Sequence, residues 1–135
     1  MDKDKVKENI QKHMEQDDVL IGFFYAQLAL KIWLFVLIGP FAAFSMKFYF
    51  VGVTSKGIHF HRLNLFGKFA DHDFFEYDEI ENVKIGKGLL QRPMKFQFKN
   101  GRNLKLKAQL KGVEKVAKLN EVTQVYIENN ITVLE

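Results

Sequence analysis

One long apolar stretch constrains the fold of this chain more than any other feature. Residues 19–53 contain only two charged side chains, Lys31 and Lys47. A helix needs about 20 consecutive apolar residues to cross about 30 Å of hydrocarbon. The longer uncharged run, Ile32–Met46, is shorter than this, and Pro40 would kink or break a helix at its middle. A single membrane-spanning helix is therefore disfavoured.

We instead expect a buried strand at residues 19–27, followed by an apolar connection at residues 28–46 that folds back. The connection can pack into the core, against a second copy of the chain, or into a bilayer surface. Because a small monomer rarely exposes a large apolar patch, we expect part of it to be buried by a second copy, making a homo-oligomer, or by a bilayer interface. The candidate association residues are Lys31, Trp33, Leu34, Phe35, Phe41 and Phe44.

Length and composition indicate one globular domain. The chain has 135 residues, 47% of them apolar, and no cysteine, which excludes disulfides, thiol catalysis and cysteine-ligated metals. Residues 1–18 are polar, with an apolar stripe at Val6, Ile10 and Met14 that predicts a helix over residues 3–16. We therefore expect an N-terminal helix at 1–18 and a single domain at 19–135, located in the cytoplasm or at the inner face of the membrane.

Charge is segregated along the sequence. Residues 71–82 contain six acidic residues and no Lys or Arg, whereas residues 83–113 contain nine basic residues and no acidic one. The two blocks can pair within one molecule or between copies. The basic block is also compatible with an anionic partner, either a membrane surface or nucleic acid.

The middle of the chain predicts short antiparallel strands. Residues 47–64 alternate as a β-hairpin around a turn at Thr54–Gly57, where Gly57 would supply a positive φ. A short strand is expected at residues 74–77, and another at residues 81–89, after a break.

Residues 94–107 form the clearest hairpin. Pairing Phe98 with Arg102 and Phe96 with Leu104 keeps the apolar side chains on one face and places Gly101 at a left-handed bulge position. The other face then carries the lysines. The candidate anion- or lipid-binding residues are Lys95, Lys105, Lys107 and, in the earlier hairpin turn, Lys56.

Residues 112–129 change to a helical period and predict a C-terminal amphipathic helix. The expected fold is mainly β with helices (α+β): a strongly bent antiparallel sheet or partial barrel of about seven strands, capped by this helix. The expected core residues are Phe48, Phe50, Ile58, Phe60, Val83, Ile85, Phe96, Phe98, Leu104, Leu106, Val116 and Leu119.

From Lys47 onward the chain resembles bacterial pleckstrin-homology-like (PH-like) domains. The resemblance rests on FYFVGVTSKGIHFHRL, FFEYDEIENVKIGKG and MKFQFKNGRNLKLKA, followed by the closing helix. Many members carry a basic residue after the first turn, where Lys56 is the nearest equivalent. The resemblance implies seven strands in two orthogonal sheets, a capping helix, and a binding or assembly module without catalysis.

The residue types also bear on two other kinds of site. His59 and His61 share a strand face, and with His72 they can ligate a metal if the segment 71–73 folds beside the hairpin; histidines without a ligand role are the more common outcome. No spacing typical of a catalytic triad or phosphate loop is present. We therefore expect no catalytic residue, metal, cofactor or small-molecule substrate. Nucleic-acid binding through the lysine-rich strands is the alternative, although it lacks stacking aromatics among the lysines.

Overall fold

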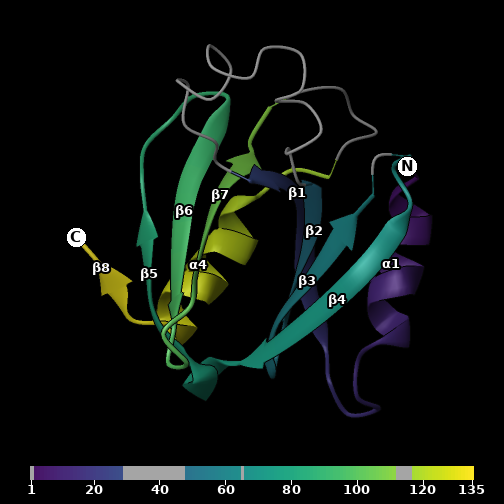
Figure 1. Cartoon of the computed structure of the whole chain (residues 1–135), viewed down its shortest axis with the longest axis horizontal. Coiled ribbons are helices and arrows are strands. Elements are labelled where there is room, and N and C mark those ends of the chain that lie inside the picture. Colours follow the sequence, from purple (N-terminus) through teal and green to yellow (C-terminus); the bar gives the residue numbers. More distant parts are fainter. Residues whose placement is uncertain (1, 29–47, 65, 112–116) are drawn as a thin grey trace.

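The computed structural model describes residues 2–28, 48–64, 66–111 and 117–135. In this part of the chain, eight strands form one sheet, and two α-helices lie against it (Figure 1). The elements, in chain order, are α1 (Lys3–Lys12), β1 (Leu20–Leu28), β2 (Phe48–Thr54), β3 (Gly57–Leu63), β4 (Phe69–Glu76), the 3-10 helix η2 (Tyr77–Glu79), β5 (Ile80–Ile85), β6 (Gln91–Phe98), β7 (Asn103–Gln109), α4 (Glu121–Asn130) and β8 (Val133–Leu134). The expected α+β class is confirmed.

The sheet is strongly curled but open. Its strand order is β4-β3-β2-β1-β7-β6-β5-β8, and every pairing is antiparallel except that of β5 with β8. Phe75 of β4 nevertheless stacks on Phe98 of β6, with ring centroids 4.1 Å apart, although four strands separate β4 from β6 in the sheet. The inner faces of the two halves of the sheet therefore share one core.

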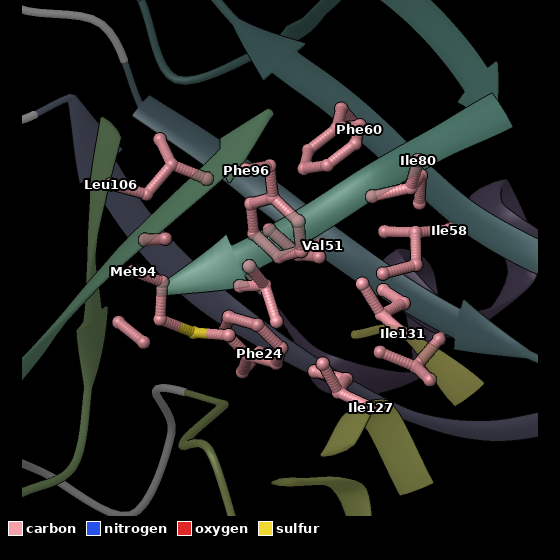
Figure 2. Packing of buried hydrophobic residues seen from close by; sticks show 14 of the residues in the cluster. Phe24, Val51, Ile58, Phe60, Ile80, Met94, Phe96, Leu106, Ile127 and Ile131 are labelled. Carbon is pink, nitrogen blue, oxygen red and sulfur yellow. The ribbon is translucent and has the colours of Figure 1, made fainter. Parts of the chain in front are cut away.

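The core fills the concave side of this sheet (Figure 2). Phe24, Met94 and Phe96 come from β1 and β6 and are nearly inaccessible to solvent, and Ile127 and Ile131 bring α4 and its end against them. Burial of this apolar surface is the main favourable contribution to folding. Helix α4 thus packs against the concave face of the sheet. The sequence predicted that a C-terminal helix would cap the sheet.

Helix α1 covers the opposite, outer face of the first half of the sheet. Val6 and Ile10 are fully buried against residues that include Phe50 and Leu63. The helix begins at an Asp2 cap, and it ends earlier than expected, with its C-cap at His13. Figure 1 shows α1 beside β4, at the other end of the molecule from β8. Strands β2 and β3 are consequently buried on both faces.

The hairpin of β6 and β7 has the register that the sequence predicted. Phe96 is paired with Leu104, the Phe98 amide donates to the Arg102 carbonyl, and Gly101 has a φ of 89°. The two expected faces are also present, because Phe96 and Phe98 are buried. This local part of the fold prediction is confirmed.

Several element boundaries differ from the sequence prediction. Strand β4 extends over eight residues instead of the short strand expected at 74–77, β5 ends at Ile85, and β8 was not expected. The C-terminal helix begins only at Glu121, because the extended residue Asn120 caps it and the Leu119 amide donates to the Gln109 carbonyl at the end of β7.

Most of the expected core residues are buried. Phe48, Ile85 and Leu104 are only partly buried, and Val116 lies outside the described residues. The expectation for Gly57 was wrong, since positive φ among the described residues occurs only at Gly67 and Gly101. The remaining expected core residues, all buried, are Phe50, Ile58, Phe60, Val83, Phe96, Phe98, Leu106 and Leu119.

The apolar connection predicted at 28–46 lies outside the described residues, apart from Leu28 at the end of β1. The six candidate association residues all belong to it, so self-association through them stays a prediction. In the described part of the chain, neither helix has the length and apolar content needed to cross a bilayer.

Candidate functional site

Four lysines gather on the outer face of the second half of the sheet. Lys84 of β5 is directly opposite Lys95 of β6, and Lys95 is directly opposite Lys105 of β7. Lys107 follows Lys105 at the next outward position of the same strand. Side chains directly opposite in antiparallel strands have Cβ atoms about 5 Å apart. These residues, called the lysine face below, therefore form a continuous row of positive charge.

Among the described residues, no acidic side chain forms an ion pair with the lysine face. Every ion pair found among them is elsewhere, and none joins the acidic block 71–82 to the basic block 83–113. Like charges directly opposite in a sheet are destabilising. A row of three such lysines therefore costs stability, and this cost would be reduced when an anion binds. Lys105 is exposed, and Lys95 and Lys107 are half-buried.

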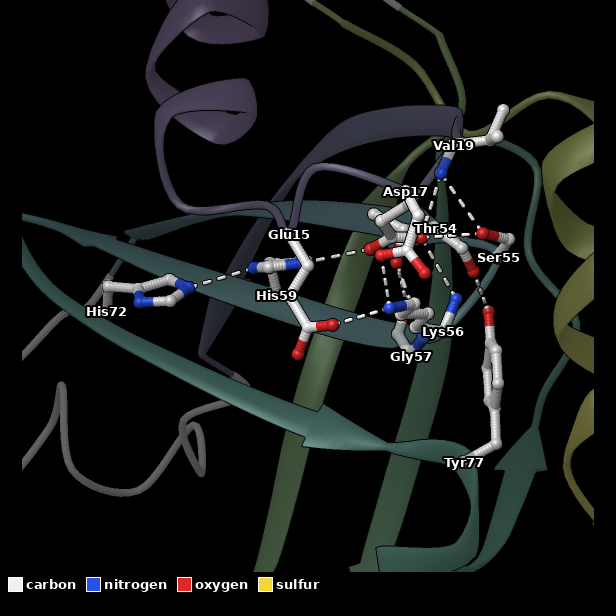
Figure 3. Close-up of polar contacts among 11 residues, drawn as sticks. Glu15, Asp17, Val19, Thr54, Ser55, Lys56, Gly57, His59, His72 and Tyr77 are labelled. Atoms are coloured by element: carbon white, nitrogen blue, oxygen red, sulfur yellow. Dashed lines mark hydrogen bonds and ion pairs between the residues drawn. The ribbon is translucent and has the colours of Figure 1, made fainter.

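Lys56, the fourth predicted anion-binding candidate, lies in a different place. Its ammonium contacts the carboxylates of Glu15 and Asp17, both at 2.5 Å (Figure 3). These hydrogen bonds raise the pKa of Lys56 well above its usual value. Through these contacts, Lys56 holds the segment after α1 against the β2–β3 turn. It does not belong to the lysine face.

Two exposed leucines lie at the end of the same hairpin as the lysines. Leu89 is 81% exposed and Leu90 is 66% exposed, in the loop between β5 and β6. The loop is held in place, because the Gly86 amide donates to the Pro93 carbonyl and the Leu110 amide to the Leu90 carbonyl. Leu89 and Leu90 are called the apolar tip below.

All four histidines of the chain meet on the outer face of the first half of the sheet, beneath the end of α1. His59 and His61 lie on β3, and His72 pairs with His61 from β4. The ring of His72 is 5.2 Å from that of His59 and 4.5 Å from that of His61. His13, at the C-cap of α1, is 4.4 Å from His72. These four residues are called the histidine cluster below.

The polar contacts of the cluster are incomplete. His59 Nδ1 and His72 Nε2 are 2.9 Å apart (Figure 3), and the Asn9 side-chain amide is 3.1 Å from His61 Nδ1. The Nε2 atoms of His59 and His61 are buried without a hydrogen-bond partner among the described residues. An unpartnered buried nitrogen is costly, so this part of the molecule has unused binding capacity.

A buried carboxylate adjoins the cluster. Asp18 Oδ2 lies 4.0 Å from His59 Nε2 and has no hydrogen-bond partner in the described part of the chain, while its side chain is only 1% exposed. The other oxygen accepts from the amides of Val19 and Lys56 and from the Ser55 hydroxyl. Burial alone would raise the pKa of Asp18, but these hydrogen bonds outweigh it, and the pKa is lowered. Asp18 is therefore an anion at neutral pH.

His59, His61 and His72 are neutral at the same pH. Burial, together with the nearby His72, lowers the pKa of His59 to about 4 and that of His61 to about 3. Burial also lowers the pKa of His72. Each of the three rings therefore keeps a nitrogen lone pair at pH 7.

The sequence identified three members of the cluster as a conditional metal site, on the condition that residues 71–73 fold beside the hairpin. The structure meets that condition through the pairing of β4 with β3. His13 and Asp18 were not anticipated. They lie beyond the end of α1 or close to it, and nothing in the local sequence pattern indicates that this segment returns to β3.

No family model matches the chain, and no curated protein matches it in sequence. Among solved structures, the hSac2 domain from human phosphoinositide phosphatase Sac2 is similar, with a TM-score of 0.54 and 11% sequence identity. The match covers 93% of this chain and 78% of that domain. At this identity, the similarity shows that the two chains share a fold.

Proposed function

We propose that this chain is a non-catalytic binding module of the PH-like type, which docks on an anionic membrane surface through the lysine face. The observation that carries the proposal is the row of Lys84, Lys95 and Lys105 across three neighbouring strands. A lysine near an anionic leaflet contributes about 1 kcal/mol to binding. Binding would also relieve the repulsion among the lysines.

The apolar tip supports a membrane as the anionic partner. It extends from the hairpin that carries Lys84 and Lys95, so exposed leucines adjoin the basic face. Leu134 of β8, 46% exposed, lies opposite Lys84 and adds apolar surface at the end of the row. Basic side chains at headgroups with apolar side chains in the interface are the usual arrangement of peripheral membrane proteins.

The similar solved domain also supports this choice. It comes from a phosphoinositide phosphatase, and phosphoinositides are anionic membrane lipids. Nucleic acid fits the lysine face less well. Binding of single strands uses aromatic side chains among the basic ones, whereas Phe96 and Phe98 point into the core. The outward neighbours of the lysines on β6 and β7 are Gln91, Pro93, Gln97, Asn103 and Gln109.

The test is co-sedimentation with phosphatidylcholine vesicles that contain or lack phosphatidylserine or a phosphoinositide. The parent chain should bind only the anionic vesicles. The triple variant Lys95→Ala, Lys105→Ala, Lys107→Ala should bind about 100-fold more weakly, since three contributions of about 1 kcal/mol are lost.

The matched control is Lys5→Ala, Lys7→Ala, Lys12→Ala, which removes the same charge from exposed positions of α1. This control should bind nearly as well as the parent chain. Absence of binding by the parent, or equal losses in both triple variants, would refute the docking face. The native mass, measured on the same samples, tests the predicted homo-oligomer separately.

A further inference from the structure

We propose that the histidine cluster binds one divalent transition-metal ion of the zinc class, with His59, His61 and His72 as its ligands. One ligand nitrogen from each of these residues lies within 4.8 Å of the others. Three imidazoles from two paired strands form a ligand set that zinc sites commonly use. The site is separate from the lysine face and does not depend on the proposed membrane docking.

Binding a metal requires a rearrangement of the three rings in which the His59 and His72 nitrogens move slightly apart and the His61 nitrogen moves closer. Tetrahedral zinc with Zn–N bonds of about 2.0–2.1 Å places its ligand nitrogens about 3.4 Å apart. His59 Nδ1 and His72 Nε2 are already 2.9 Å apart and face each other. A metal would replace this single hydrogen bond, and a modest rotation of the His61 ring would complete the triangle.

The surroundings provide the outer partners that metal-ligating histidines usually have. With Nδ1 of His59 on the metal, its Nε2–H points to the buried carboxylate of Asp18, and a carboxylate behind a ligand histidine is a common feature of zinc sites. Asn9 can hold His61 in a similar way. With its side-chain amide turned over, the Asn9 oxygen accepts from Nδ1–H and leaves the unpartnered Nε2 as the ligand atom.

His13 lies at the solvent side of the cluster, with its ring 4.4 Å from that of His72. The Nδ1–H of His13 donates to the Asn9 carbonyl at 2.9 Å, which leaves its other nitrogen facing away from that bond. His13 is exposed and His72 is half-buried, so an ion can enter from this side. We assign His13 to this entrance and leave the fourth position to water.

The chemistry of the donors selects the metal. Imidazole nitrogen suits Zn²⁺, Co²⁺, Ni²⁺ and Cu²⁺, whereas Mg²⁺ and Ca²⁺ prefer oxygen ligands. The chain has no cysteine, so the site does not resemble thiolate sites that favour Cu⁺. The buried carboxylate of Asp18, which lies 4.0 Å from His59 Nε2, offsets part of the charge of a dication.

The first test uses the parent chain without a histidine tag, after removal of metal with EDTA. Titration with Zn²⁺ should show one ion per chain by calorimetry. Because every imidazole of the chain belongs to the cluster, ¹⁵N NMR of the ring nitrogens reports directly on ligation. The ring signals of three histidines should shift to the positions of metal-bound nitrogen, and EDTA should restore them. Mg²⁺ should have no such effect.

Two variants test the ligand assignment. His72→Gln, at a half-buried position that tolerates a polar residue, should reduce Zn²⁺ affinity by more than the roughly 10–100-fold that loss of an outer partner costs. His13→Gln is the matched control, and it should keep the affinity within about 10-fold. Circular dichroism should show that both variants remain folded.

Unchanged ring signals at saturating Zn²⁺ would overturn the proposal. Binding of several weak ions, insensitive to His72→Gln, would also overturn it, because exposed carboxylates would then be the ligands. Equal losses in His13→Gln and His72→Gln would refute the three-ligand assignment.

Discussion

Position 57 requires glycine for a reason that the local sequence does not reveal. The sequence suggested a positive φ in the hairpin turn, but the backbone there is ordinary. A Cβ atom at Gly57 would lie 2.1 Å from the Phe75 carbonyl oxygen of β4. Position 57 therefore needs glycine because β4 pairs closely with β3. A turn pattern cannot predict this contact, since the partner strand lies further along the chain.

We expect Gly57→Ala to lower the free energy of unfolding by about 2–3 kcal/mol, because the clash is with backbone and resembles overpacking of a core. Gly101→Ala is the comparison, because Gly101 has a φ of 89° and a Cβ atom there would meet only open space. It should cost about 1 kcal/mol, from backbone strain alone. Urea denaturation of both variants measures the difference, and equal costs would contradict the role of β4.

At the scale of secondary-structure elements, local pairing was predictable and distant pairing was not. The register of β6 and β7 follows from the alternation of Phe96 and Leu104 around a glycine turn, so a short stretch contains all the information. The start of α4 depends on Leu119 bonding to the end of β7. Helical periodicity alone extended that helix too far, because it cannot detect a competing contact with the sheet.

The candidate sites were likewise predictable where their residues belong to one hairpin, and not where they depend on pairing between distant strands. The sequence placed Lys95 and Lys105 on one face, since they belong to one hairpin. It did not single out Lys84, which joins the row only because β5 pairs with β6. The three histidines were likewise recognised as residue types, but whether they meet depends on the pairing of β4 with β3.

The apolar tip, in the loop between β5 and β6, should contribute to membrane binding. Leu89→Ser combined with Leu90→Ser should weaken binding to anionic vesicles by about 10-fold, which corresponds to about 1.4 kcal/mol of lost apolar insertion. The free energy of unfolding should hardly change, because both side chains are exposed. Flotation of the variant with vesicles at low and high salt measures the effect. Vesicle binding by the variant should be more sensitive to salt than vesicle binding by the parent chain.

Val122→Ser combined with Val125→Ser is the matched control for that experiment. These valines are also exposed, but they lie on α4, away from the lysine face. The control should bind as the parent does. A similar loss in both double variants would mean that the apolar tip has no special role in insertion.

At the scale of the whole molecule, the two candidate sites occupy different halves of one sheet. The histidine cluster lies on β3 and β4 beneath α1, and the lysine face lies on β5, β6 and β7. Strands β1 and β2 separate them in the strand order. Distant sites without shared partners usually contribute independently.

We therefore expect the two sites to act independently. His72→Gln should leave vesicle binding unchanged, and the triple lysine variant should bind Zn²⁺ with the affinity of the parent chain. The measurement is vesicle binding with EDTA and with saturating Zn²⁺, for the parent and each variant. A change of more than roughly threefold in either cross-test would reveal coupling through the sheet, since additive sites deviate by at most a few tenths of a kcal/mol.

Among the described strands, β4 lies at the edge of the sheet, and this position has a consequence for aggregation. An unpaired rim strand is a template on which another chain can add a strand, which is the route to fibrils. Asp71 and Asp73 lie on β4 and are exposed, and Arg62 neutralises only Asp71. A second β4 approaching edge to edge would bring these carboxylates against its own. We therefore expect Asp71 and Asp73 to disfavour strand addition at this edge of the sheet.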